Sequence, residues 1–222
     1  MINDTSASTG KTPVAIPGLL LHAASVFAFL TVVLGIVYPI AVTGVARVVF
    51  PDQAQGSLVR EEGKVIGSAL IGQDWSGTGL FMGRPSTVGY DAMSSGGSNQ
   101  ALSNLTFQKD VLSRAKAWRE KVGGNAVNTP VPQVLLTASG SGLDPDLPIE
   151  AVRYQIPYVA RSTGLSEEIL LMLAEETSRE DFLAFGASPL VNVLELNCRV
   201  VAELGITMDE WIRRTKEAVA TR

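Results

Sequence analysis

The sequence predicts an α+β protein in which a single N-terminal transmembrane helix precedes one mixed, water-facing domain with Gly/Ser-rich loops. Hydrophobic residues make up 46% of the 222 residues, and most of that excess lies before Phe50. After Phe50, short strand-like alternations and helical periodicities follow one another, separated by stretches rich in glycine and serine. The remaining length suffices for one domain with a hydrophobic core.

The apolar segment predicts a membrane anchor over residues 17–46, in contact with lipid, after a tail over residues 1–16. Between Lys11 and Arg47 no residue is charged if His22 is neutral, and residues 19–42 are nearly all apolar. A helix over that apolar core is about 36 Å long and crosses a hydrocarbon layer of about 30 Å.

A signal peptide, a buried core helix and an interfacial helix all fit this segment less well. A cleaved signal peptide has an apolar region of about 7–15 residues after a basic start, whereas residues 1–10 contain neither lysine nor arginine. A helix that is apolar on all sides finds too little protein to bury it in a chain of this size. An interfacial helix requires a charged face, which is absent.

The composition of the anchor bears on its neighbours and its orientation. Gly35, Pro39 and Gly44 are compatible with close packing against other membrane helices, and equally with a lone anchor. Lys11 precedes the span, while Arg47 and Arg60 follow it. This small difference weakly favours a cytoplasmic C-terminus and does not decide the orientation.

The water-facing domain is expected over residues 47–204, followed by a helical extension over residues 205–222. Residues 56–72 predict short strands with a turn at Glu62-Gly63-Lys64. Residues 72–98 predict a long ordered loop that Trp75, Phe81 and Tyr90 attach to the core.

Four helices are predicted in the rest of the chain from their caps and periodicity. They cover residues 104–122 with Ser103 or Asn104 as N-cap, residues 149–162 with an interruption or a start at Pro157, residues 167–176 after Ser166, and a segment from the Ser188-Pro189 cap to Glu203. In the extension, Thr207 and Glu210 predict a capping box for a last amphipathic helix.

Catalytic and metal sites are not predicted. The single histidine, His22, lies in the anchor, and the single cysteine, Cys198, is expected to be a small buried residue. These two residues form neither a metal cluster nor a catalytic triad, although Ser-Lys or carboxylate catalysis stays open. Residues 138–142, ASGSG, lack the first glycine of a nucleophile elbow. The GKT at residues 10–12 follows no strand and is not interpreted as a P-loop.

Two Gly/Ser loops, residues 94–99 and 139–144, are the remaining candidates for a site. Their backbone N–H groups can form anion nests, with Arg84 and Arg153 as possible phosphate partners. Alternatively, their glycines only make tight turns. The net charge of −4 argues against a nucleic-acid partner.

Five segments resemble one family when they are taken in order behind a single anchor. The chain is similar to the C subunits (KdpC) of bacterial Kdp potassium-transporting ATPases, from the anchor to about Asn197. The similarity rests on FPDQAQGSL at 50–58, GSALIGQ at 67–73, GRPS, GYD and SGGSN at 83–86, 89–91 and 95–99, LLTASGSGLDP at 135–145, and VNVLELN at 191–197.

This resemblance implies a non-catalytic accessory subunit of a high-affinity potassium uptake pump in the bacterial inner membrane, with its large domain in the periplasm. Implied partners are an ATP-hydrolysing P-type subunit, a channel-like potassium-binding subunit and a small single-helix subunit. The family is described as a catalytic chaperone that stabilises the assembly and raises the ATP affinity of the ATPase subunit. No firmly bound cofactor is implied. Ser95, Gly96, Gly97 and Ser98 would form the proposed nucleotide nest.

Direct ATP contact conflicts with a periplasmic domain, because ATP is cytoplasmic. The domain could instead steady the potassium entrance, or act through the anchor helix. Two features depart from the family pattern: residues 100–105 lack an expected proline, and residues 205–222 are not expected in the family core. The alternatives are a membrane-anchored cell-envelope enzyme and an anchored binding domain, each using a Gly/Ser loop.

Overall fold

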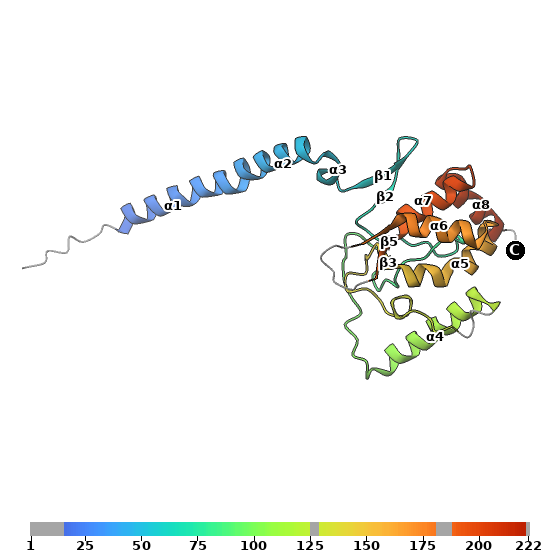
Figure 1. Cartoon of the computed structure of the whole chain (residues 1–222). Helices are drawn as coiled ribbons and strands as arrows, with labels where there is room; N and C mark the ends of the chain where they lie inside the picture. Colours follow the sequence, from blue (N-terminus) through green and yellow to red (C-terminus); the bar gives the residue numbers. More distant parts are fainter. Residues whose placement is uncertain (1–15, 125–128, 181–187, 221–222) are drawn as a thin grey trace, which may run out of the picture. The chain divides into compact units, whose positions relative to one another are not determined.

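The computed structural model describes residues 16–124, 129–180 and 188–220 (Figure 1). The chain divides into two compact units, with the division between Gln55 and Gly56. The first contains the apolar helix and the second contains the mixed domain, so the predicted fold class is confirmed.

The apolar helix is continuous through three segments. α1 covers Ile16–Val32, the π-helical turn η1 covers Val33–Val37, and α2 covers Tyr38–Val49; the short helix α3, Pro51–Ala54, follows. Among the described residues, Pro17–Val49 is the one helix long and apolar enough to cross a membrane; it has 33 residues and contains an 18-residue window with a mean hydropathy of 2.4. At about 1.5 Å per residue it is about 50 Å long, more than the hydrocarbon thickness requires.

The π-turn explains how this helix accommodates Pro39. Proline lacks the N–H that would donate to the carbonyl four residues earlier. The turn before it is widened, and the N–H of Tyr38 donates to the carbonyl of Val33, five residues back. Pro39 itself lies in the first turn of α2. The sequence analysis did not predict this local change of helix type.

Polar side chains in α1 are satisfied within the helix. Ser25 and Thr31 donate to the carbonyls of Leu21 and Phe27, each at 2.8 Å, and His22 Nδ1 lies 2.7 Å from the carbonyl of Gly18. Internal pairing of this kind lowers the cost of placing polar groups in lipid.

The mixed domain begins with a hairpin. β1, Leu58–Glu61, pairs antiparallel with β2, Lys64–Ser68, and the register shifts at a bulge between Val59 and Arg60. Glu62 and Gly63 form the two-residue turn, both with positive φ (49° and 82°), as the turns of tight hairpins require. The predicted strands and turn are confirmed.

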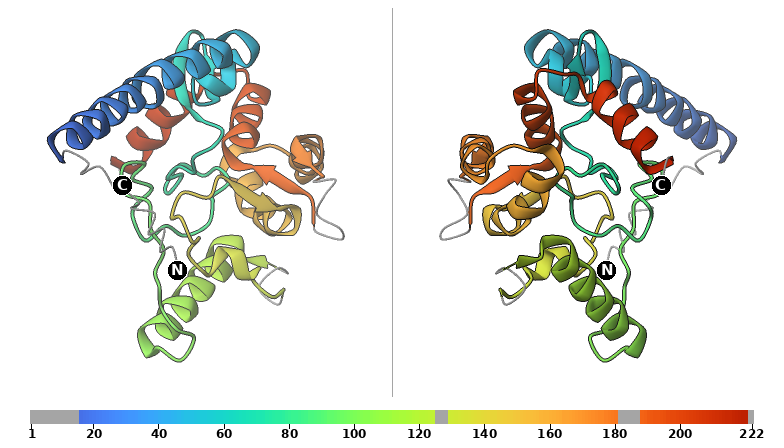
Figure 2. Two further views of the ribbon diagram at one scale, coloured as in Figure 1. Left: turned by 90° about the vertical axis from the view of Figure 1, so that its left-hand side faces the viewer. Right: turned by 90° about the vertical axis from the view of Figure 1, so that its right-hand side faces the viewer.

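The helices of the domain contact one another in chain order (Figures 1 and 2). The contacts run from α4, Leu105–Val122, through α5, Ile149–Thr163, α6, Glu167–Thr177, and α7, Val193–Glu203, to α8, Met208–Ala220. Asn104, Ser166 and Thr207 each accept a backbone N–H in the first turn of the helix that follows, and this confirms three predicted caps. Pro157 lies inside α5, which continues through it to Thr163, whereas the sequence predicted an interruption or a helix start there.

A small antiparallel sheet adjoins these helices. Its strands are β3, Asp146–Pro148, β4, Ser178–Arg179, and β5, Leu190–Asn192, in the order β3-β5-β4. A single 3₁₀ turn, η3, covers Gln133–Leu135. The sequence did not predict these three strands.

The predicted helix start at Ser188-Pro189 is wrong. Residues 190–192 form β5, and the carbonyl of Pro189 accepts from the N–H of Ile149 at 2.9 Å, at the start of α5. The actual N-cap of α7 is Asn192, whose Oδ1 accepts from the N–H of Glu195 at 3.1 Å. An asparagine three residues before a glutamate is the usual capping signal, and it was available in the sequence.

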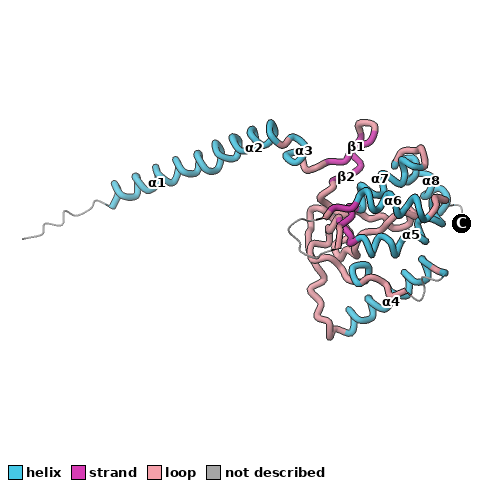
Figure 3. Tube along the Cα trace, in the orientation of Figure 1, coloured by secondary structure: helices cyan, strands magenta, loops and turns pink. Residues whose placement is uncertain are grey.

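An extended segment passes through the core between α5 and α7. Residues 69–104 contain neither helix nor strand, as Figure 3 shows, yet Leu80 and Phe81 are fully buried. The side-chain amide of Asn197 pairs with both backbone groups of Phe81, at 3.0 and 2.9 Å. That of Gln155 pairs in the same way with Met82, at 2.9 and 3.0 Å. The two buried amides thus replace neighbouring strands for this segment.

The C-terminal helix α8 is tied to the rest of the domain. Met208 is fully buried, and its N–H donates to Glu61 at the end of β1 at 2.8 Å. Trp211 Nε1 donates to the carbonyl of Thr78 at 2.9 Å. This helix is therefore part of the core packing.

Candidate functional site: two packed Gly/Ser loops

The two Gly/Ser loops pack directly against each other. The N–H of Gly96 donates to the carbonyl of Ser141 at 2.8 Å, and the Ser95 hydroxyl donates to the same oxygen at 3.0 Å. A Cβ on Gly97 would lie 2.9 Å from the carbonyl oxygen of Gly140, so only glycine fits there without movement. These serines and glycines bring two backbones together.

Gly142 is the tightest position of the second loop. Its φ is +69°, and a Cβ there would lie 2.6 Å from Val88 and 2.7 Å from the carbonyl oxygen of Gly96. Its own carbonyl accepts from the Ser86 hydroxyl at 2.7 Å. That hydroxyl oxygen in turn accepts from the N–H groups of Val88 and Tyr90, at 3.2 and 2.9 Å. Ser86 therefore joins the GRPS and GYD segments to the second loop.

Arg84 is neutralised within the site. Its Nη1 lies 3.1 Å from Asp144 Oδ2, and its Nη2 donates to the carbonyl of Ala138 at 3.3 Å. The Tyr90 hydroxyl donates to the carbonyl of Arg84 at 2.7 Å. Burial raises the pKa of Tyr90 to about 12, with a further contribution from the charge of Asp74, so the phenol stays protonated at neutral pH.

The remaining candidates are one arginine outside the loops, a buried serine at the start of the second loop and the N-terminal GKT. Arg153, on α5, pairs with Glu175 of α6 at 2.9 Å. Ser139 is buried, and its N–H donates to the carbonyl of Pro85. The GKT of residues 10–12 lies outside the described residues. Within the described ranges, no group of three or more His, Cys, Asp or Glu side chains could hold a metal.

The hydrogen bonds between the two loops hold distant parts of the domain together, so the first role of the loops is structural. An anion nest needs unpaired N–H groups that converge on one point. The N–H of Gly96 and the hydroxyl of Ser95 both already donate to Ser141. The predicted nest at Ser95, Gly96, Gly97 and Ser98 therefore stays a prediction, and it requires the first loop to separate from the second. The glycine and serine content of the sequence indicates both loops, but it does not indicate that they pair with each other.

A matched pair of substitutions distinguishes the two roles of these glycines. Gly97→Ala is expected to destabilise the domain by about 1–3 kcal/mol, because its Cβ meets backbone atoms of Gly140. Gly96→Ala is expected to be nearly neutral, because its Cβ meets only Val88 at 3.6 Å. Urea unfolding, monitored by tryptophan fluorescence, measures both. If these glycines instead let a nucleotide approach the backbone, both variants would reduce the effect of the chain on ATP affinity to a similar degree, with little loss of stability.

One apolar helix joined to an α+β domain with paired loops defines a class of membrane-anchored proteins with one candidate span. The family model for the K+-transporting ATPase c chain, KdpC, matches residues 20–202. The chain belongs to the KdpC family.

Similar proteins support the same assignment. The chain is 48% identical over 179 residues to the potassium-transporting ATPase KdpC subunit of Pseudomonas putida strain GB-1, which covers 80% of this chain and 93% of the relative. Identity is 45% over 177 residues for the Pectobacterium atrosepticum subunit, with 77% and 90% covered. It is 42% over 173 residues for that of Caldanaerobacter subterraneus subsp. tengcongensis, with 78% and 89% covered. The matched region ends before α8.

Proposed function

We propose that this chain is the non-catalytic accessory subunit of a high-affinity, ATP-driven potassium uptake complex. Its partners would be a P-type ATPase subunit, a channel-like potassium-binding subunit and a small single-helix subunit. The observation that supports this best, beside the family match, is the helix Pro17–Val49. Its large apolar side chains are exposed along its whole length, and they require lipid or other membrane helices as partners.

In this proposal the domain lies in the periplasm and raises the ATP affinity of the ATPase subunit from a distance. The free energy of coupling would pass through the membrane helix or through the partner subunits. We favour this coupling over direct contact with ATP, because the hydrogen-bond donors of Ser95 and Gly96 already bind the carbonyl of Ser141. The paired loops would then keep the domain surface in the shape that the partners bind.

Co-purification tests the proposed assembly. A tagged copy of the full chain, extracted in mild detergent, is expected to bring down a P-type ATPase and a channel-like subunit in defined stoichiometry. The purified complex should hydrolyse ATP in response to potassium, whereas the chain alone should not. Recovery of the chain alone, or ATP turnover by it, would contradict the proposal.

Packing of the helix against partners is tested at Gly44. Apart from its chain neighbours and the backbone of its own helix, no described atom lies within 4 Å of a Cβ at this position. Gly44→Leu is expected to reduce recovery of the partner subunits about tenfold if another helix packs closely there. Val45→Leu, of similar apolar character and small volume change, is the matched control. Equal recovery for both variants would mean that Gly44 faces lipid.

Side-specific labelling tests the periplasmic placement. Met93 is 94% exposed, so Met93→Cys gives an accessible thiol. Burial, with the charges of Glu61 and Glu195, raises the pKa of Cys198 to about 11, so the native thiol stays protonated and reacts slowly at neutral pH. A membrane-impermeant maleimide is expected to label the variant in cells with a permeabilised outer membrane and an intact inner membrane. Labelling only after the inner membrane is opened would place the domain in the cytoplasm.

A further inference from the structure

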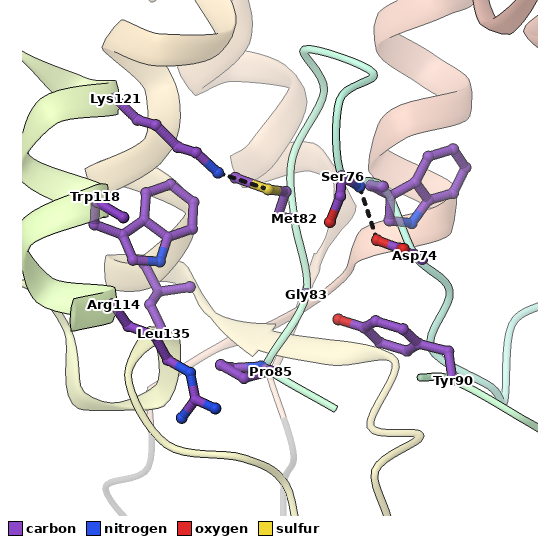
Figure 4. A pocket seen from close by; sticks show the side chains of 12 residues that line it. Asp74, Ser76, Met82, Gly83, Pro85, Tyr90, Arg114, Trp118, Lys121 and Leu135 are labelled. Carbon is purple, nitrogen blue, oxygen red and sulfur yellow. Dashed lines mark hydrogen bonds between the residues drawn. The ribbon is translucent and has the colours of Figure 1, made fainter. Parts of the chain in front are cut away.

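A cavity of about 230 Å³ opens between α4 and the extended segment of residues 74–90 (Figure 4). It lies below the range of about 300–1,000 Å³ that is usual for drug-sized ligands, so it suits a small molecule. Two indole rings, those of Trp75 and Trp118, are among its lining, and both are buried. Neither the paired loops nor the membrane helix contributes to its lining.

One wall of the cavity is positively charged. Arg114, Trp118 and Lys121 recur at a spacing of four and three residues, which places them on one face of α4. Much of the Lys121 side chain is exposed, but its ammonium lies 5.4 Å from the centre of the Trp118 ring and 3.7 Å from the sulfur of Met82. This partial desolvation lowers the pKa of Lys121. Arg114 donates one N–H to the carbonyl of Leu136, at 2.9 Å. Within the described ranges, neither cation has a carboxylate at ion-pair distance.

The facing wall is acidic and hydroxylic. Asp74 accepts from the N–H of Ser76 at 2.9 Å and is in no ion pair with a described residue. The Tyr90 hydroxyl donates its hydrogen bond to the backbone carbonyl of Arg84, so the hydroxyl oxygen can still accept one. In Figure 4 these groups and Lys121 approach the cavity from opposite sides. The cavity therefore has positive charges on one wall and a negative charge on the facing wall.

We propose that this cavity binds a small zwitterion that carries both a phosphate or carboxylate and an ammonium group. The anionic group would bind Lys121 and Arg114, and the ammonium group would bind Asp74 and the oxygen of Tyr90. A simple anion gains from the first wall but is repelled by Asp74. A simple cation, potassium included, is repelled by Lys121 and Arg114. A ligand with both charges is the class that satisfies both walls.

The site is tested with the full-length chain in detergent micelles, using O-phosphoethanolamine as the probe. The three tryptophan indole N–H signals are followed by NMR during the titration. Trp75 and Trp118 line the cavity and are expected to shift with millimolar probe. Trp211, which donates to Thr78 and lies outside the lining, is expected to stay in place and serves as the internal reference. Absence of any saturable shift at Trp75 and Trp118 would overturn the proposal.

Three variants assign the two ends of the ligand. Lys121→Met is expected to weaken binding of the probe about three- to tenfold, since it removes one partly exposed charge partner. Lys116→Met is the matched control, because Lys116 lies on the same helix with its side chain 81% exposed, and its ion-pair partner among the described residues is Glu120. Asp74→Asn is expected to weaken binding of the zwitterionic probe, whereas binding of inorganic phosphate should stay equal or become stronger. Equal effects of Lys121→Met and Lys116→Met would overturn the assignment.

The zwitterion could be a free metabolite or a lipid headgroup, and a second arm distinguishes these sources. Nanodiscs of phosphatidylglycerol are compared with nanodiscs that also contain phosphatidylethanolamine. A headgroup in the cavity would shift Trp75 and Trp118 without any added probe and would block the titration. Identical spectra and equal titrations in both lipids would assign the site to a free molecule. The proposal is independent of the pump role, because it requires only binding by this chain.

Discussion

Replacing Asn197 with leucine is expected to lower the free energy of unfolding of the water-facing domain by about 2–6 kcal/mol. The change leaves two buried backbone groups without a hydrogen-bond partner, and each unpaired group costs about 1–3 kcal/mol. Asn197 is fully buried, and its amide satisfies both the N–H and the carbonyl of Phe81. Leucine has the same branched arrangement of side-chain heavy atoms, although it is larger, and it has neither a donor nor an acceptor. Because a domain is stable by only about 5–15 kcal/mol in total, this single change approaches the limit that the fold tolerates.

Urea unfolding of the full chain in detergent measures this effect. All three tryptophans lie in the water-facing domain, so their fluorescence reports its unfolding rather than that of the membrane helix. Asn104→Leu is the matched control, because Asn104 is an exposed helix cap whose loss costs about 0.5–2 kcal/mol. A loss at Asn197 no greater than the loss at Asn104 would show that the amide contacts do not hold the segment.

The same contacts position the candidate site. Asn197 and Gln155 hold Phe81 and Met82, and two residues further on the chain reaches Arg84, which binds Asp144 and Ala138 of the second loop region. A shift of the segment at Phe81 therefore moves the joint between the two loops. For this reason Asn197→Leu is expected to weaken assembly with the pump subunits even at a temperature where the domain remains folded.

Helices were predictable from this sequence because their signals are local. A cap such as Asn104 or Ser166 bonds to its own helix, and a period near 3.6 extends over more than ten residues. The three-stranded sheet was not predictable, because its strands contain only two or three residues and alternation needs a longer run. Ser188-Pro189 resembles a helix start, but the residues after it form β5, because their backbone pairs with β3 and β4.

For the candidate site, the sequence indicated which segments matter but not what they contact. The glycines of both loops stand out in composition, whereas the bond from Gly96 to Ser141 joins positions 45 residues apart. The cavity beside Trp118 depends equally on tertiary structure, because α4 supplies one wall and residues 74–90 the other. Contacts between distant segments carry no periodicity, so a single sequence does not reveal them.

The C-terminal helix provides the second large expected effect. Met208→Ala is expected to lower the free energy of unfolding by about 2–5 kcal/mol, as buried methionine-to-alanine changes do when the site cannot collapse. Met208 is fully buried, although it lies beyond the region that matches the family model. Deletion of residues 205–222 is expected to cost still more, because it also removes the bonds from Met208 to Glu61 and from Trp211 to Thr78.

Thermal and urea unfolding compare these variants with Lys64→Ala, which breaks the exposed ion pair with Asp209 and should change stability little. If the deletion leaves stability unchanged, α8 serves a partner instead of the domain, and co-purification of the truncated chain would then fail. If stability falls as expected, the effect should reach the hairpin of β1 and β2 first, because Glu61 loses its backbone partner on α8. Faster amide exchange in residues 58–68 than in α5 would be the signature, since α5 keeps its contacts with α4 and α6.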